Sequence, residues 1–273
     1  MMLFSGQPQP FCDLLLVVET GNTIASIALF RGSECLEVHK VLSPVMSCRE
    51  NVSAQLMPIL ENHPTLRDAA LCSVVPSLDQ PILDTLRSYL PGEVVKVTSS
   101  MQLPFTLHYD SPESFGADRI ALCALGCQLY AGKAVIALDI GTAITVDVLD
   151  SSHHYLGGLI MPGLDLMAKS LHEHTARLPL VALGRPETLV GISTVECIRN
   201  GIVLSCVSGI DGLLVKLQRW LREERGEEHI RVIAAGGNAP LVAAMLDASP
   251  VVEEHAVLRG SRFLFSLNAR PWS

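Results

Sequence analysis

Two short segments of the sequence combine an acid, a glycine and small polar residues directly after an apolar run. The first is Glu19-Thr20-Gly21-Asn22-Thr23 and the second is Asp139-Ile140-Gly141-Thr142-Ala143. Glycine permits tight turns in which the backbone approaches a ligand closely. Amides and Thr or Asn side chains in such turns can bind phosphate oxygens, and an acid at a strand end can hold a cation. Each turn alone suits an ordinary hairpin, but the pair predicts a nucleotide triphosphate held by two turns.

A second group of reactive residue types lies between the two turns, as Tyr109-x-x-Pro112 followed by Gly116-Ala117-Asp118-Arg119. Asp118 falls in the first turn of a predicted helix, where an acid complements the helix dipole or serves as a general base. Arg119 beside it suits a carboxylate or phosphate ligand. Tyr109 suits a substrate contact or an aromatic position at the rim of a pocket.

Two later positions have similarly open interpretations. Thr194 begins a predicted long helix that Ser193 already caps, so it either completes the helix start or contacts a ligand. Gly236-Gly237 joins a predicted strand to a helix, where backbone can meet a flat ligand such as adenosine. The histidines show no recognised metal-ligand spacing, and the sequence contains no P-loop motif.

The elements around these residues repeat. An apolar strand at 14–18, a turn and a second strand at 24–30 return as 135–138, a turn and 144–149. Such repetition predicts two similar α/β halves, 1–132 and 133–273, with the first ending near Gly132. Ser-x-x-Glu/Gln boxes predict helices that start at Ser47, Ser77 and Ser193. The last of these helices should run to Arg225 and stop at Gly226.

The composition limits the classes of partner. Of 273 residues, 49% are hydrophobic and 18% charged, which predicts a sizeable aliphatic core. The net charge of −8 argues against nucleic acid or an anionic membrane as partner. The longest stretch without charged residues, 232–246, is too short to span a bilayer. The N-terminus is a poor signal peptide, and eight cysteines without a Cys-x-x-Cys pair indicate free thiols in the cytoplasm.

Together and in order, these motifs resemble type III pantothenate kinase, a family of the actin-like ATPase superfamily. The resemblance covers nearly the whole chain, and its joint order and spacing are specific although each motif alone is weak. Further matching segments are Ser73-Val74-Val75-Pro76, Gly157-Gly158-x-Ile160-x-Pro162-Gly163, Thr175-Ala176-x-Leu178-Pro179, Gly191-x-x-Thr194 and Gly236-Gly237-Asn238-Ala239. The resemblance implies two actin-like (ribonuclease H-like) domains, each a mixed sheet flanked by helices, with a cleft between them.

The resemblance also implies a reaction and a role for each matching residue. The reaction is transfer of the ATP γ-phosphate to the hydroxyl of pantothenate, which gives 4′-phosphopantothenate, the first step of coenzyme A biosynthesis. ATP with Mg²⁺ would be bound by Glu19, Thr20, Gly21, Asn22, Thr23, Ile24, Ala25, Ser26 and Thr142. Asp118 would be the catalytic base. Pantothenate would be bound by Tyr109, Gly116, Ala117, Asp118, Arg119 and, from the partner of a homodimer, Thr194. Asp139 would bind a monovalent cation, K⁺ or NH₄⁺.

One position departs from the family pattern, because the first motif normally opens with Asp and here opens with Glu19. The same charge then sits one methylene further from the backbone, and a displacement of about 1 Å at an active site can cost ~10²-fold in rate. Glu19 therefore leaves open a catalytically weak homologue that binds ligands in a regulatory role. Because the superfamily shares the two phosphate turns, another small-molecule kinase of the superfamily is a second open alternative. Residues 1–12 form a longer extension than the family usually has and are expected to be disordered.

Overall fold

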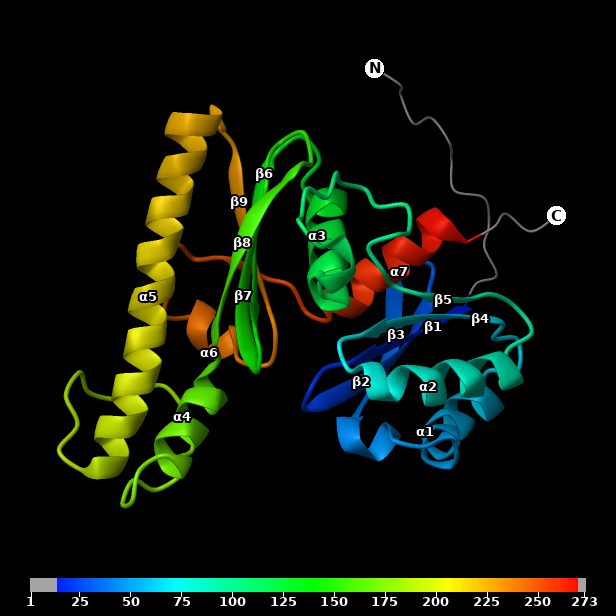
Figure 1. Cartoon of the computed structure of the whole chain (residues 1–273), viewed down its shortest axis with the longest axis horizontal. Helices are drawn as coiled ribbons and strands as arrows, with labels where there is room; N and C mark the ends of the chain where they lie inside the picture. The colour runs from blue at the N-terminus through cyan, green and yellow to red at the C-terminus, as the bar shows by residue number, and fades with distance from the viewer. Residues whose placement is uncertain (1–13, 270–273) are drawn as a thin grey trace. The chain divides into compact units, whose positions relative to one another are not determined.

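The computed structural model describes residues 14–269, so the extension expected at 1–12 lies outside the described residues. The chain divides into two units, each built on one five-stranded mixed sheet (Figure 1). Of the described residues, the first unit comprises 14–103, 113–121 and 257–269. The second comprises 104–112 and 122–256.

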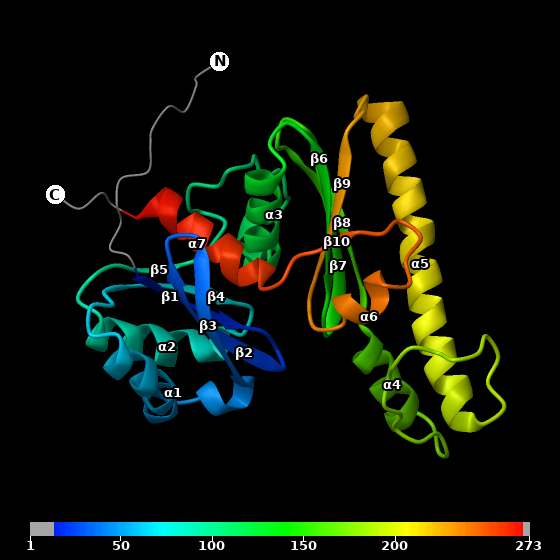
Figure 2. The same ribbon diagram turned by 180° about the vertical axis from the view of Figure 1, so that it is seen from behind.

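The first sheet has the order β3-β2-β1-β4-β5. Its strands are β1 (Leu14–Thr20), β2 (Ile24–Arg31), β3 (Glu34–Leu42), β4 (Asp68–Ser73) and β5 (Val94–Lys96). The apolar run of β1 is buried on both faces, because α1 (Arg49–Asn62) and α2 (Pro76–Tyr89) cover one face and α7 (Ala256–Asn268) covers the other (Figure 2). β1 pairs antiparallel with β2 and parallel with β4, so the turn after β1 emerges at the carboxyl end of two parallel strands.

The second sheet repeats this arrangement. Its strands are β6 (Ala134–Ile140), β7 (Ala143–Leu149), β8 (Tyr155–Pro162), β9 (Ile230–Ala235) and β10 (Val251–Val252). The order β8-β7-β6-β9-β10 matches that of the first sheet strand for strand, and β6 again pairs antiparallel with the next strand and parallel with β9. This equivalence confirms the prediction of two actin-like α/β halves.

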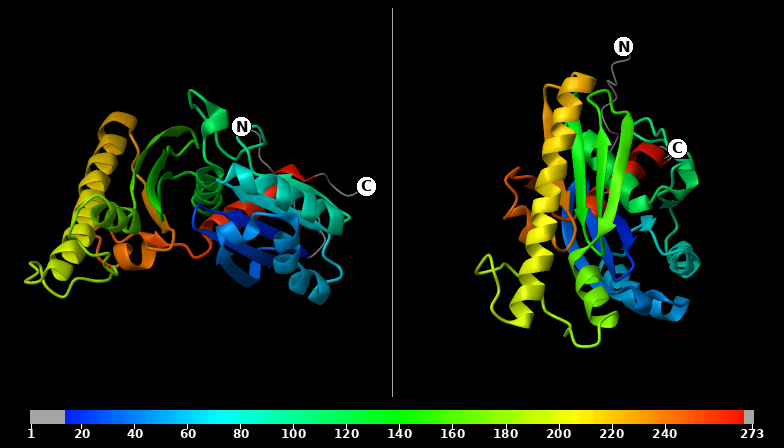
Figure 3. Two further views of the ribbon diagram at one scale, coloured as in Figure 1. Left: turned by 60° about the horizontal axis from the view of Figure 1, so that its bottom comes forward. Right: turned by 60° about the vertical axis from the view of Figure 1, so that its left-hand side comes forward.

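Helices cover both faces of the second sheet as well. α5 (Thr194–Arg225), α4 (Leu164–Glu173) and α6 (Ala239–Ala243) pack on one face, and α3 (Ala117–Leu129) places Gly126 against Val135 and Ile233 on the other (Figure 3). α5 is long and apolar enough to suit a membrane span by length and composition. Its buried residues, such as Ile202 and Ile210, belong to the core formed with the sheet, which accounts for that apolar character. Two 3₁₀ turns, η1 (Ser43–Met46) and η2 (Pro112–Ser114), complete the described elements.

The predicted helix boundaries are partly confirmed. Ser193 caps α5, its hydroxyl accepting the Glu196 N–H at 3.3 Å, and Gly226 ends the helix in the left-handed conformation. The predicted caps at Ser47 and Ser77 are wrong. η1 occupies the residues before Ser47 and moves the N-cap of α1 to Cys48. Proline at the first helical position starts α2 one residue before Ser77.

Each of the two units is assembled from segments that lie far apart in the sequence. α7 lies in the first unit because its Leu258 and Phe265 pack with Leu15 and Val17 of β1. Residues 104–112 and the part of α3 from 122 onward cluster instead with the second unit. The last helix of the chain therefore completes the core of the first sheet.

Candidate active site

The first acid-x-Gly turn joins β1 to β2 and is held from outside by Ser43. Glu19 pairs with Ser26 across the two strands, and the Gly21 N–H donates to the Ile24 carbonyl at 3.0 Å. The Ser43 hydroxyl donates to the Gly21 carbonyl at 2.6 Å, and the Ser43 N–H donates to the Thr23 carbonyl at 3.0 Å. Asn22 and Thr23 are exposed. Ser43 was missed by sequence reasoning because no motif spacing marks a residue that acts through the backbone 20 residues away.

The second turn joins β6 to β7 at the equivalent place. Asp139 pairs with Thr145 across the strands, and the Gly141 N–H donates to the Ala143 carbonyl at 3.1 Å. The Gly163 N–H donates to the Thr142 carbonyl at 3.0 Å, and a Cβ on Gly163 would overlap the carbonyl oxygens of Gly141 and Thr142. The glycine of the Pro162-Gly163 motif thus lets α4 begin directly against this turn.

The glycine pair at 236–237 approaches the same turn. Gly236 has φ +96°, and a Cβ there would overlap the Asp139 carboxylate and the Ile140 backbone. The Asn238 N–H donates to the Ile140 carbonyl at 2.9 Å, and its side-chain amide donates to the Asp165 carboxylate at 3.3 Å. Three segments far apart in sequence, 139–142, 163–165 and 236–238, therefore meet at one end of the second sheet.

The polar groups around Asp139 are oxygen donors. Thr145 pairs directly opposite Asp139, so both side chains stand on the same face of the sheet. The Thr145 side chain is only 8% exposed, and among the described residues its hydroxyl has no hydrogen-bond partner. Carboxylate and hydroxyl oxygens are the ligands of hard cations, so the residues present fit the cation that the family resemblance implies. Within 14–269, no three His, Cys, Asp or Glu side chains cluster as a metal site.

In the first unit, Gly116 and Asp118 fit together at the start of α3. The Asp118 carboxylate accepts the Arg119 N–H at 2.7 Å and lies so close to Gly116 that a Cβ there would overlap it. Burial raises the pKa of Asp118 above its ordinary value, while the Arg119 N–H and guanidinium charge oppose the rise in part. The spacing Gly-x-Asp therefore produces a half-buried carboxylate whose proton affinity is higher than that of an exposed Asp.

Arg119 is buried, and its guanidinium lies 4.4 Å from the centre of the Phe115 ring. This stacking on an aromatic face fixes the direction of the side chain. Ala117, also buried, begins α3. All four residues of the motif Gly116-Ala117-Asp118-Arg119 thus belong to the first unit, as do Glu19 to Ser26.

The remaining predicted site residues belong to the second unit. Tyr109 is 37% exposed, and its ring meets the Tyr155 ring edge-on with centroids 6.1 Å apart. Thr194 is the exposed first residue of α5 and lines a groove of about 1300 Å³ formed by α4, α5 and the segment before α5. Asp139 and Thr142 lie in the turn described above. Within this unit Asp139, Thr142 and the 236–238 segment are brought together.

The groove and the segment beside it are apolar. Leu166, Met167, Leu171 and Ile198 line the groove, together with Ile192, which is 97% exposed. Leu189 and Val190 of the same segment are also largely exposed. So many large apolar side chains together on a surface are typical of an interaction site rather than of scattered exposed residues.

Known structures resemble this chain in fold. A Baf-family protein from Campylobacter jejuni aligns with a TM-score of 0.55 and 18% identity, over 92% of this chain and 96% of that one. The Lmo2764 protein from Listeria monocytogenes aligns with a TM-score of 0.51 and 12% identity, over 92% and 98%.

Sequence relatives are much closer. The type III pantothenate kinase of Chlorobium luteolum is 50% identical over 259 residues, 95% of this chain and 96% of its own. That of Streptomyces coelicolor is 30% identical over 268 residues, 93% and 98% of the two chains. The family profile of type III pantothenate kinase matches residues 15–216, which include every residue to which the resemblance assigns a role in catalysis or binding. The chain therefore belongs to the type III pantothenate kinase family.

Proposed function

We propose that this protein transfers the γ-phosphate of ATP to the hydroxyl of pantothenate and so makes 4′-phosphopantothenate for coenzyme A synthesis. The observation that carries the proposal is the half-buried carboxylate of Asp118, which lies directly against Gly116. The chain belongs to this family and has two equivalent acid-x-Gly turns. Phosphoryl transfer needs a positioned acceptor, a base and charge neutralisation more than covalent chemistry.

The two turns are the proposed ATP site. The turn with Glu19, Gly21 and Ser26 would bind phosphates through amides and the exposed Asn22 and Thr23, and Thr142 would contact ATP from the second turn. Both turns are closed by a hydrogen bond that the glycine N–H donates, and they are supported from outside by Ser43 and by Gly163. A support that is in place before the ligand binds lowers the ordering cost of binding.

Asp118 is the proposed general base for the pantothenate hydroxyl. A base works best when its pKa lies near the working pH, and burial moves the pKa of Asp118 in that direction. Arg119, with Gly116 and Ala117, would bind pantothenate, whose carboxylate suits a guanidinium held in a fixed direction. Tyr109 would also contact pantothenate.

Asp139, with the Thr145 hydroxyl opposite it, is the proposed holder of a monovalent cation, K⁺ or NH₄⁺. A cation bound there would supply positive charge for the phosphates of ATP, in a chain whose net charge is −8. Mg²⁺ would enter with ATP, because it retains waters and binds mainly through substrate phosphates.

The apolar groove supports a homodimer in which Thr194 of one chain reaches the substrate of the other. Ile192→Asp should then yield monomers in light scattering coupled to size-exclusion chromatography, with loss of pantothenate-dependent turnover. Tyr89→Asp, an equivalent change on the first unit, serves as control. A wild-type protein that is monomeric at micromolar concentration contradicts this part of the proposal.

The seven described cysteines are free thiols, in keeping with a cytoplasmic enzyme.

The decisive experiment is ATP-to-ADP turnover by the purified protein, with and without pantothenate, in K⁺ and then in Na⁺. We expect pantothenate-dependent turnover that K⁺ favours and that Asp118→Asn abolishes. Folded protein that binds ATP or pantothenate without turnover would favour the alternative that Glu19 raises, a weak homologue that acts by binding ligands.

A further inference from the structure

The segment that carries Tyr109 lacks regular structure but is attached to the hairpin of β7 and β8. The Thr106 N–H donates to the His153 carbonyl at 2.8 Å, and the Tyr155 N–H donates to the Thr106 carbonyl at 2.9 Å. These two bonds form an isolated parallel bridge between Thr106 and His154, the residue directly before β8. Tyr109 therefore sits three residues beyond a fixed point of the second unit.

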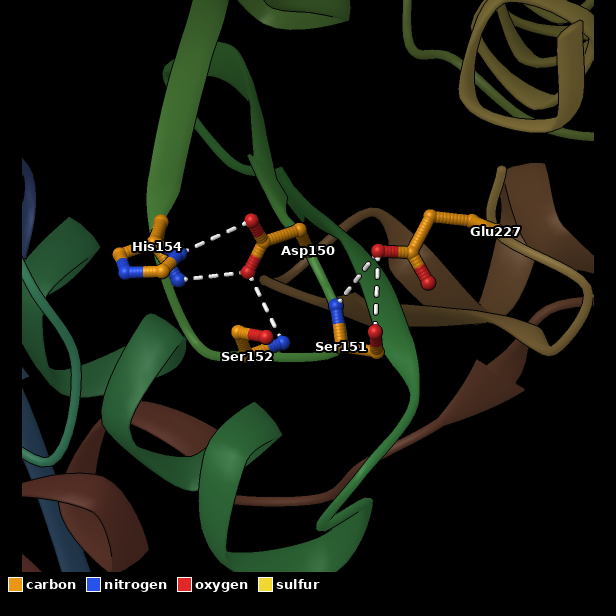
Figure 4. Close-up of polar contacts among 5 residues, drawn as sticks. All are labelled: Asp150, Ser151, Ser152, His154 and Glu227. Atoms are coloured by element: carbon orange, nitrogen blue, oxygen red, sulfur yellow. Dashed lines mark hydrogen bonds and ion pairs between the residues drawn. The ribbon is translucent and has the colours of Figure 1, made fainter. Parts of the chain in front are cut away.

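Side-chain hydrogen bonds hold the turn between β7 and β8, which provides this fixed point (Figure 4). The Asp150 carboxylate accepts the N–H groups of Ser152 at 2.9 Å and His154 at 2.8 Å and contacts the His154 ring at 3.0 Å. Glu227, just past α5, accepts both the N–H and the hydroxyl of Ser151. The hairpin is thus fastened within itself and to the end of α5, so the backbone at Tyr155 is well constrained.

Tyr155 is constrained at its other end as well. Its side chain is 2% exposed, and its hydroxyl donates to Oδ1 of Asp147, which is fully buried, at 3.0 Å. The ring that lies between these two attachments is the one that meets Tyr109 edge-on, at an interplanar angle of 69°. Edge-to-face pairs have a preferred geometry, so the direction of the Tyr155 ring favours one orientation of the half-exposed Tyr109 ring.

We infer that Tyr155, held by the buried Asp147, is a positioning residue for substrate affinity that places the Tyr109 ring against pantothenate. The inference rests on the proposed function, in which Tyr109 lines the pantothenate site. Removal of the Tyr155 hydroxyl leaves the ring volume intact but releases the ring from Asp147. The Tyr109 ring then loses its fixed neighbour without any change to Asp118 or to the two phosphate turns.

Tyr155→Phe tests this directly. We expect the KM for pantothenate to rise by about tenfold, the size of the coupling between contacting residues. The KM for ATP and kcat should change by less than about twofold, because only interactions with pantothenate are weakened. Titration calorimetry with pantothenate should show the same loss of affinity. The matched control is Tyr89→Phe, since Tyr89 is exposed at the end of α2 and should leave all constants unchanged.

A double-mutant cycle separates positioning from a general structural effect. In a Tyr109→Ala background, Tyr155→Phe should no longer raise the KM for pantothenate, because the ring that it positions is gone. Additive effects in the cycle, or an equal rise in both KM values, overturn the inference. If Tyr109→Ala itself leaves the KM for pantothenate unchanged, the proposed role of Tyr109 fails and the inference fails with it.

One outcome separates the inference from the proposed function. If Tyr109→Ala weakens pantothenate binding but Tyr155→Phe does not, the inference is overturned and the proposed function stays intact. Should Tyr155→Phe unfold, Asp147→Leu removes the acceptor of the Tyr155 hydroxyl and keeps a similar side-chain volume, and we expect the KM for pantothenate to rise in the same direction. No rise with Asp147→Leu in folded protein would then overturn the inference.

Discussion

The hydroxyl of Ser43 lies 2.6 Å from the carbonyl oxygen of Gly21 and closes the first acid-x-Gly turn from outside. Ser43 is itself buried, and its N–H bonds the carbonyl of Thr23 in the same turn. The turn thus has a fixed shape although Asn22 and Thr23 face solvent. A residue outside every recognised motif therefore controls the geometry of the proposed phosphate site.

Ser43→Ala should raise the KM for ATP several-fold and lower the free energy of unfolding by about 1–3 kcal/mol, because the Gly21 carbonyl loses a buried donor. Thermal unfolding and initial rates at varied ATP measure the two effects. Ser88→Ala also removes a serine-to-carbonyl bond, to Thr85 in α2, and is the matched control for stability. An unchanged KM for ATP in Ser43→Ala would separate the first turn from ATP binding.

Asp118→Asn should lower turnover by about 10²–10⁴-fold, the usual contribution of a general base. For the wild type, the acid limb of kcat/KM for pantothenate should lie above the ordinary Asp value of 3.8, because burial raises the pKa of Asp118. A pH-rate profile measures that limb. A limb at the ordinary value, or full activity of Asp118→Asn, contradicts the assignment of the base.

The raised pKa of Asp118, which favours its action as a base, lowers the stability of the folded protein at neutral pH. The folded protein holds the Asp118 proton more tightly than the unfolded chain, so this group costs stability as pH rises from the ordinary pKa through the raised folded pKa. Asn carries no such charge. Asp118→Asn should therefore be at least as stable as wild type at neutral pH by thermal unfolding, and a clear loss of stability there would argue for a structural role of the carboxylate.

Gly163→Ala should be severely damaging, because its Cβ would overlap the backbone oxygens of Gly141 and Thr142 in the second acid-x-Gly turn. Backbone oxygens cannot move aside as the end of a flexible side chain can. Overpacking of this kind costs about 1–3 kcal/mol, and a displaced turn should also raise the KM for ATP. Gly212→Ala in α5 meets open space and should instead gain about 0.5–1 kcal/mol. Both are measured by thermal unfolding and ATP kinetics, and equal behaviour of the two variants would refute the steric argument.

Local features of the fold and the candidate site could be predicted from the sequence, whereas long-range contacts could not. The paired strands, their turns and the capped start of α5 follow from local patterns, and all were predicted. The partners of those turns were not, because Ser43 and Tyr155 act through long-range contacts that no spacing encodes. The caps at Ser47 and Ser77 failed because a 3₁₀ turn and a proline outweighed a local serine signal. The contact of Phe265 in α7 with Leu15 in β1 joins the two ends of the described chain, and no local pattern encodes it.

Thr145→Val should separate cation binding from packing, since it keeps the shape and removes the hydroxyl opposite Asp139, which has no hydrogen-bond partner within residues 14–269. Without added cation the variant should be more stable, because a buried unsatisfied hydroxyl costs about 1–3 kcal/mol. The rise in melting temperature on adding K⁺ should shrink, and activation by K⁺ should need higher concentrations. A loss of stability without cation, or an undiminished response to K⁺, would contradict a role for this hydroxyl.

Glu19→Asp tests the one departure from the family pattern. Glu19 and its partner Ser26 are seven residues apart, whereas Asp139 and Thr145 are six apart, so the first turn is one residue longer than the second. We expect the longer side chain to suit this longer turn, whose shape Ser43 fixes. Asp would then fall short by about 1 Å and lose roughly 10-fold or more in kcat, within the ~10²-fold cost of such a displacement. Glu19→Gln, which keeps the length and removes the charge, should lose at least as much. Steady-state kinetics with pantothenate decide the matter, because a strong rise in rate for Glu19→Asp would show that Glu19 restrains turnover and that the wild-type protein acts mainly by binding its ligands.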